Sequence, residues 1–141
     1  MFKVIVWASD GSEHADRALE YAQKLAEASS AKLIATHVRE INVGRAGSYP
    51  VQPGEDETEQ KIQGQAKAAK DAGIDAEYEQ PGAHVGGAAH AIADLAAARK
   101  AELIVVGTRG QGPVKGLLVG SVTQRLLHIA ACPVLAVPPA S

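Results

Sequence analysis

The chain has 141 residues, of which 46% are hydrophobic and 4% aromatic, and its formal net charge is -2. This length predicts one domain, residues 1–141, whose core is filled more by small side chains than by rings. The charge shows no basic excess of the kind that binds nucleic acid, and no apolar run is long enough to cross a membrane. Because the N-terminus lacks the pattern of a signal peptide, we expect a cytoplasmic protein.

Apolar runs and stretches of helical periodicity alternate along the chain. They predict strands over residues 2–8, 31–38, 74–79, 103–106 and 133–137, and helices over residues 12–29, 56–72, 88–100 and 121–131. Segment 39–54 is rich in Gly and Pro and lacks periodicity, so we expect a mobile linker there, and a loop over residues 81–87. Alternating strands and helices indicate an α/β protein with a parallel sheet and helices on both faces.

The segment from Leu103 to Ser121 carries the strongest functional signal. An apolar run typical of a buried central strand is followed by Gly107, further glycines, and then Ser121–Gln124, which has the form of a capping box that opens a helix. We expect this helix to turn Val122, Leu126, Ile129 and Ala130 inward. Glycine allows a ligand to approach the main chain, and a helix start offers unpaired N–H groups, so this order is typical of a phosphate site. The glycines could instead serve only as turns.

The glycine spacing is Gly107-x-x-Gly110, then nine residues, then Gly120-Ser121. It resembles the nucleotide-binding signature of the universal stress protein family. The Asp-Gly-Ser turn at 10–12, the pair His37-Val38 and the closing segment 131–135 resemble the same family, so the resemblance runs from end to end. It implies a doubly wound, Rossmann-like fold with one five-stranded parallel sheet in the order 3-2-1-4-5, numbered by position among the predicted strands. The first and fourth strands are then neighbours, where such folds bind ligands.

The resemblance also implies an adenine-nucleotide site, occupied by ATP with Mg²⁺ carried on the nucleotide. Asp10 would lie near the ribose, adenine or metal, the backbone of Val38 would read the adenine edge, and the glycines and Ser121 would hold ribose and phosphates. The residues expected to bind nucleotide are Ala8, Ser9, Asp10, Val38, Gly107, Thr108, Arg109, Gly110, Gly120, Ser121 and Val122.

Several of these residues have a second interpretation. Asp10 also suits the N-cap of the first helix, Ser121 is explained by capping alone, and Arg109 could be an ordinary exposed cation. The histidines lack metal-binding spacing and are read as non-ligands. Loop 81–87 departs from the short Gly-x-Pro turn usual in the family and could reshape the adenine or ribose end of the site. Some members of the family prefer cAMP, so the resemblance also leaves this ligand open.

The sequence shows no Ser-His-Asp set or paired carboxylates at the spacing of a known catalytic motif, so we expect ATP to be bound and hydrolysed slowly or not at all. The family resemblance implies a regulator of the stress response. A second hypothesis is a dimeric interaction protein that needs no nucleotide, its protein partners unknown. The last strand would be an apolar edge of the sheet, open to pairing with another chain. In the family this strand pairs antiparallel across a homodimer, which implies an interface of Pro133, Val134, Leu135, Ala136 and Val137.

Overall fold

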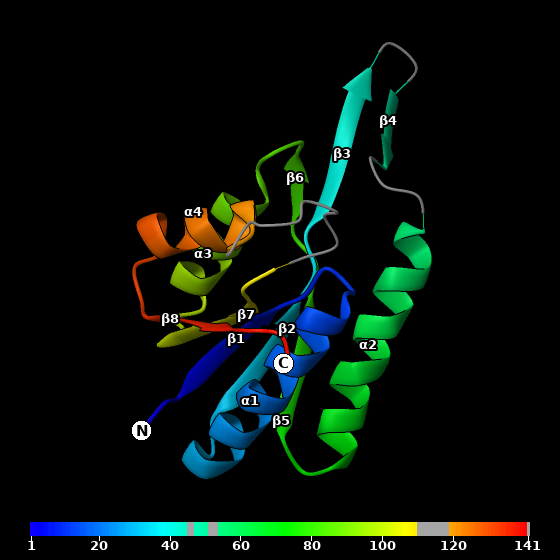
Figure 1. Cartoon of the computed structure of the whole chain (residues 1–141). Coiled ribbons are helices and arrows are strands. Elements are labelled where there is room, and N and C mark those ends of the chain that lie inside the picture. Colours follow the sequence, from blue (N-terminus) through cyan, green and yellow to red (C-terminus); the bar gives the residue numbers. More distant parts are fainter. Residues whose placement is uncertain (45–46, 51–53, 110–118, 141) are drawn as a thin grey trace.

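The computed structural model describes residues 1–44, 47–50, 54–109 and 119–140 (Figure 1). In chain order its elements are β1 (Val4–Ala8), α1 (Glu13–Ser29), β2 (Lys32–Thr36), β3 (Arg39–Gly44), β4 (Gly47–Pro50), α2 (Glu55–Asp71), β5 (Asp75–Glu79), β6 (Gly82–His84), α3 (Ala88–Ala98), β7 (Leu103–Gly107), α4 (Ser121–Ile129) and β8 (Val134–Val137). Within these ranges, no helix is both long enough and apolar enough to span a bilayer.

The main sheet has five parallel strands in the order β5-β2-β1-β7-β8. Counted along this sheet alone, that is the predicted order 3-2-1-4-5, so the doubly wound α/β fold is confirmed. Strand β1 is central: Ile5 lies opposite Leu33 of β2 on one side and Leu103 of β7 on the other. The uninterrupted apolar sequence of β1 follows from this place, because a parallel central strand is covered on both faces.

Each face of the sheet packs against two helices (Figure 1). Side chains alternate along a strand, so Ile5 and Trp7 enter the core under α1 and α2, while Val6 enters the core under α3 and α4. Both layers pack closely through small side chains. Helix α1 meets the sheet through Ala15, Ala18, Ala22 and Ala26, each at most 3% exposed.

Trp7 is the largest side chain in the core and is fully buried. Its indole Nε1 donates to the Ala15 carbonyl oxygen at 2.9 Å, so the one polar atom of the ring is satisfied inside an apolar layer. This contact ties the end of β1 to the first turn of α1. The turn that joins the two elements is thereby held between fixed ends.

The sequence predicted no strands over residues 39–54 and 81–87, and this is wrong for residues 39–44, 47–50 and 82–84. Strands β3 and β4 form an antiparallel hairpin, and β3 also pairs in parallel with β6. The resulting small sheet, β4-β3-β6, stands beyond the carboxyl ends of the main strands (Figure 1). Its strands are short and one pairing joins distant segments, so local periodicity gave little sign of them. The Arg39 amide, for example, donates to the Pro81 carbonyl oxygen at 3.0 Å.

Helix α4 presents two adjacent leucines in opposite environments, which allows a matched test of its orientation. Leu126 is fully buried, whereas Leu127 is 53% exposed. We expect Leu126→Ala to lower the free energy of unfolding by about 2–5 kcal/mol, because it leaves a cavity. Leu127→Ala should change it by no more than about 0.5 kcal/mol. Urea denaturation measures both, and equal losses would contradict the orientation of α4.

Candidate functional site

The carboxyl ends of β2, β1 and β7 lie at one edge of the main sheet, because these neighbouring strands are parallel. The chain leaves β1 toward β2 on one side and later returns to β7 on the other side. The order of strands therefore reverses between β1 and β7. In open parallel sheets this switch point is where ligands bind.

The turn after β1 is fixed by its own side chains. The Gly11 amide donates to Ser9 Oγ, and the Ser12 amide donates to Asp10 Oδ1, both at 3.0 Å. Gly11 has a φ of +84°, in the left-handed region that favours glycine. The Asp10 carboxylate is thus held by the backbone at the switch point.

Ser12, and not Asp10, is the N-cap of α1. Its hydroxyl oxygen accepts a hydrogen bond from the Ala15 amide at 3.3 Å. The interpretation of Asp10 as the cap is therefore wrong, because Asp10 precedes the N-cap and its carboxylate accepts from the Ser12 amide in an Asx turn. Glu13 and Asp16 supply the acidic first turn of the helix.

The exit of β7 and the start of α4 are joined by two hydrogen bonds. Thr123 Oγ1 donates to the Gly107 carbonyl oxygen at 2.7 Å, and the Gly120 amide donates to the Thr108 carbonyl oxygen. The two ends of the glycine-rich segment are therefore held next to each other. Gly110, expected to bind phosphate, lies outside the described residues.

Gly107 is a glycine for a reason of packing. A Cβ atom there would lie 3.0 Å from the His14 carbonyl oxygen and 3.1 Å from that of Arg109. Both contacts are with backbone, which moves less easily than a flexible side chain. The approach of α1 to the end of β7 thus requires glycine whether or not a ligand binds.

Helix α4 begins at Ser121, with Gly120 as its N-cap. The predicted capping box is therefore wrong: the N-cap lies one residue earlier than expected, and no side chain within the described residues caps this helix end. Val122, expected inward, is 37% exposed, whereas Thr123 is 6% exposed and takes the inward place. The first turn of α4 thus presents backbone N–H groups beside an exposed Ser121 hydroxyl.

The structure brings the described members of the predicted set to one edge. Ala8 ends β1 and is followed by Ser9 and Asp10, and Val38 follows β2. Gly107 ends β7 and is followed by Thr108 and Arg109, and α4 opens with Gly120, Ser121 and Val122. Ala8 and Ser9 are buried, Val38 is half-buried, and Arg109 is exposed. Among described residues, no group of three or more His, Cys, Asp or Glu gathers in a form that could hold a metal.

Sequence reasoning missed a buried pair beside this edge. His37 is 5% exposed and Glu55, the first residue of α2, is 8% exposed. His37 Nδ1 lies 2.9 Å from the Ser9 carbonyl oxygen, and Nε2 contacts Glu55 Oε1. The sequence singled out His37 only as part of a family motif, and gave no sign that Glu55 would meet it.

Tyr78 lies near this pair. Burial raises the pKa of Tyr78 to about 12, and the negative charges of Glu59 and Glu55 add to the effect. The phenol therefore stays protonated throughout the physiological range.

The two edges of the main sheet differ in chemistry. On β5, Glu77 meets Lys32 at 3.1 Å and Arg99 at 2.8 Å, and these partners hold the pKa of the Glu77 carboxyl below its usual value. Asp75 and Glu79 extend this charged edge. The β8 edge has only the apolar side chains Val134, Leu135, Ala136 and Val137. A charged edge resists pairing with another strand, whereas an apolar edge favours it.

Comparison with known proteins places the chain among relatives of one kind. The family model described as "Universal stress protein family" matches residues 1–138. A Thermus aquaticus protein, "Universal stress protein in QAH/OAS sulfhydrylase 3'region", is 36% identical over 97% of this chain and 99% of its own length.

Solved structures agree with this fold. The structure of the hypothetical protein MJ0577 matches all of this chain and 99% of its own with a TM-score of 0.81, at 22% identity. A universal stress protein in complex with cAMP matches 96% of each chain with a TM-score of 0.66, at 28% identity.

Two glycines allow a matched test of the close packing at the end of β7. Gly107→Ala should destabilise the protein by about 1–3 kcal/mol, because its Cβ meets backbone. Gly64 lies in α2 with nothing within 4 Å of a Cβ, so Gly64→Ala should stabilise by up to about 1 kcal/mol. Denaturant unfolding measures both changes. A neutral Gly107→Ala would contradict the approach of α1 to β7.

Proposed function

The chain belongs to the universal stress protein family, and from this premise we propose that it binds an adenine nucleotide, ATP with Mg²⁺, at the switch point between β1 and β7. The observation that carries the proposal is the meeting of three features at this edge. These are the Asp10 turn, the exit of β7, and the start of α4, which no described side chain caps.

The phosphates would lie against the first turn of α4. Backbone N–H groups and the positive end of the helix dipole favour anions there. The exposed Ser121 hydroxyl adds a donor, and the exposed Arg109 brings a positive charge from the end of β7. Gly110, Gly120 and Thr108 would complete the phosphate and ribose contacts, as the signature spacing implies.

The remaining groups suit the other parts of the nucleotide. Mg²⁺ is usually held by substrate phosphates and only one or two carboxylates, which fits a single Asp10 beside the phosphates. Val38 follows β2, the strand next to β1, and its backbone would meet the adenine edge. Ala8 and Ser9, at the end of β1, would lie beside the same part of the nucleotide. Val122, exposed at the start of α4, would contact the sugar or phosphates. This set binds and orients a nucleotide but supplies no evident base for rapid hydrolysis.

A cyclic nucleotide is the second candidate ligand. A structure 28% identical to this chain is that of a universal stress protein in complex with cAMP. Cyclic AMP has one phosphate and would depend less on Arg109 and on the glycine segment than ATP does. The two ligands are therefore separable by their response to the same substitutions.

Nucleotide binding is tested by calorimetric titration of nucleotide-stripped protein with ATP, with and without Mg²⁺, and with cAMP. We expect micromolar ATP binding that Gly110→Val abolishes, because a branched side chain blocks approach to the main chain. Arg109→Gln should weaken the binding of ATP roughly tenfold, and it should weaken the binding of cAMP less. Arg125→Gln, which removes an equally exposed arginine from the middle of α4, is the control.

The same titration decides against the proposal if folded wild-type protein binds neither nucleotide. Release of phosphate from ATP should be slow or absent. Rapid turnover that a folded Asp10→Ala variant loses would overturn the role as a binding protein and make Asp10 part of an active site.

We also propose that the protein is a homodimer through antiparallel pairing of β8, in which nucleotide tunes the partners of the dimer. The Pro133 carbonyl oxygen accepts from the Ile104 amide of β7, and the Val137 carbonyl oxygen accepts from the Thr108 amide just after β7. Backbone groups alternate in direction along a strand, so Val134 and Ala136 direct theirs away from β7, toward a second chain. These outward groups, with Leu135 between them, form the expected interface.

Ala136→Pro tests this interface, because it removes an outward N–H and leaves the bonds to β7 in place. Light scattering after size exclusion should find a dimer for wild type and for the control Ala136→Ser, and a monomer for Ala136→Pro. A proline variant that stays dimeric would contradict pairing through β8.

A further inference from the structure

The turn that carries Asp10 is braced by α2, a helix that does not itself belong to the proposed nucleotide site. The Ser9 carbonyl oxygen accepts a hydrogen bond from His37 Nδ1, and Glu55 of α2 holds the other side of that ring. Two residues further on, the Gly11 carbonyl oxygen accepts a hydrogen bond from Lys61 Nζ, also of α2, at 2.8 Å. The carbonyl groups on both sides of Asp10 are thus fixed from outside the turn.

Hydrogen-bond chemistry determines where one proton of the His37 ring must be. A carbonyl oxygen only accepts, so Nδ1 carries a hydrogen and donates it to Ser9. Nε2, on the opposite side of the ring, contacts the Glu55 carboxyl. Glu55 therefore holds the ring in the orientation in which Nδ1 points its hydrogen at Ser9, as carboxylate partners do for histidines in metal and catalytic sites.

The position of Glu55 indicates a role beyond packing of α2. The helix is anchored on the sheet by Ile62, Ala66 and Ala69, which lie one or more turns further along. Glu55 is a charged residue outside that apolar cluster, yet it is almost fully buried at the very start of the helix. Burying a carboxylate is costly unless it is paired, and the partner here is a histidine that reaches the Asp10 turn.

We propose that Glu55 and His37 form a positioning pair that fixes the Ser9 carbonyl, and with it the Asp10 carboxylate, for nucleotide binding. The consequence for affinity rests on the proposed function, whereas the fixing of the turn does not. The pair joins the start of α2 to the switch point, so the affinity of the site depends on a glutamate that touches no nucleotide. By linkage, a bound nucleotide stabilises the contact between Glu55 and His37 in return.

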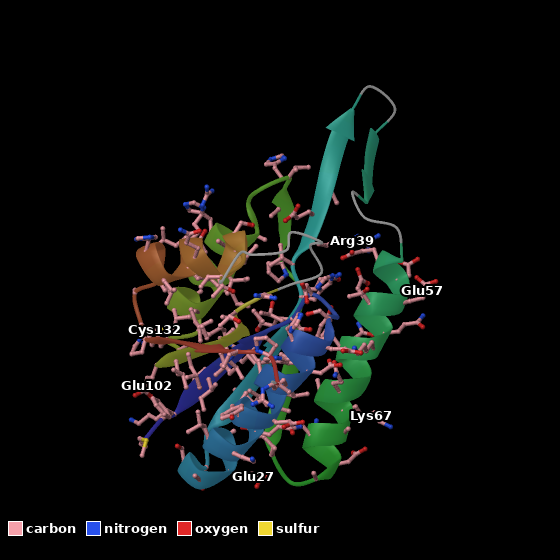
Figure 2. The ribbon with its side chains drawn as sticks, in the orientation of Figure 1. Glu27, Arg39, Glu57, Lys67, Glu102 and Cys132 are labelled. Carbon is pink, nitrogen blue, oxygen red and sulfur yellow. The ribbon has the colours of Figure 1, made fainter. Side chains whose placement is uncertain are left out.

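Helix α2 offers a matched control for this pair. Glu57 lies in the same first turn, where it is exposed on the outer side of the helix (Figure 2). Glu57→Gln removes the same charge from the same helix end without touching His37. Comparison of Glu55→Ala and Glu55→Gln with Glu57→Gln therefore separates the loss of the pair from the loss of a helix-dipole charge.

The experiment combines ATP titration, thermal melting, and hydrogen exchange of the Gly11 and Ser12 amides followed by NMR. We expect Glu55→Ala to weaken ATP about tenfold and to speed exchange at both amides, because their acceptors lie in the loosened turn. Glu55→Gln should recover most of the ATP affinity and of the slow exchange. The glutamine amide can donate to Nε2, so Nδ1 keeps its hydrogen and its hydrogen bond to the Ser9 carbonyl oxygen. Glu57→Gln should match wild type in affinity and exchange.

A merely structural pair would give a different pattern. Glu55→Ala would then melt at a lower temperature but keep the wild-type affinity and the wild-type exchange of Gly11 and Ser12, and this result overturns the proposal. If wild-type protein binds neither ATP nor cAMP, the proposed function fails separately. The exchange measurement then still tests whether Glu55 and His37 fix the Asp10 turn. Faster exchange of Gly11 and Ser12 in Glu55→Ala supports this role, and unchanged exchange overturns it.

Discussion

The parallel pairing of β1 with both β2 and β7 is the constraint on which the rest of the structure depends. It buries β1 on both faces, which its apolar sequence permits, and it places three strand exits at one edge of the sheet. The Asp10 turn, Val38 and the exit of β7 come from distant parts of the chain and meet only because of this order. Helix α4 then begins beside β7 through the bonds of Gly120 and Thr123.

The main sheet and its helices could be predicted from the sequence because their signals are local. Buried parallel strands appear as apolar runs such as 103–106, and α1 shows its alanine stripe at helical spacing. The small sheet β4-β3-β6 could not be predicted, because part of its stability comes from backbone pairing between segments about forty residues apart, Arg39 with Gly82. The Gly and Pro content of segment 39–54 led to the prediction of a linker, but such a composition does not exclude a short hairpin.

The sequence indicated which residues lie at the candidate site better than it indicated what each of them does there. The glycine spacing pointed to the edge of the sheet where β1 and β7 end, yet Gly107 has its own packing reason for being glycine. The caps of α1 and α4 were each misplaced, since Ser12 and Gly120 take the positions given to Asp10 and Ser121. The contact of His37 with Glu55 joins the end of β2 to the start of α2, which the strands β3 and β4 separate along the chain. No spacing rule reports such a contact.

The most direct test of the central claim is a hydrogen-exchange footprint of the whole chain, with and without saturating ATP and Mg²⁺. Binding at the switch point predicts slower exchange over the turn after β1, at Val38, and from the exit of β7 through the first turn of α4. The far ends of the strands and the C-terminal half of α2 should not change. Protection elsewhere, or none at a concentration where ATP is shown to bind, would contradict a nucleotide site at this edge.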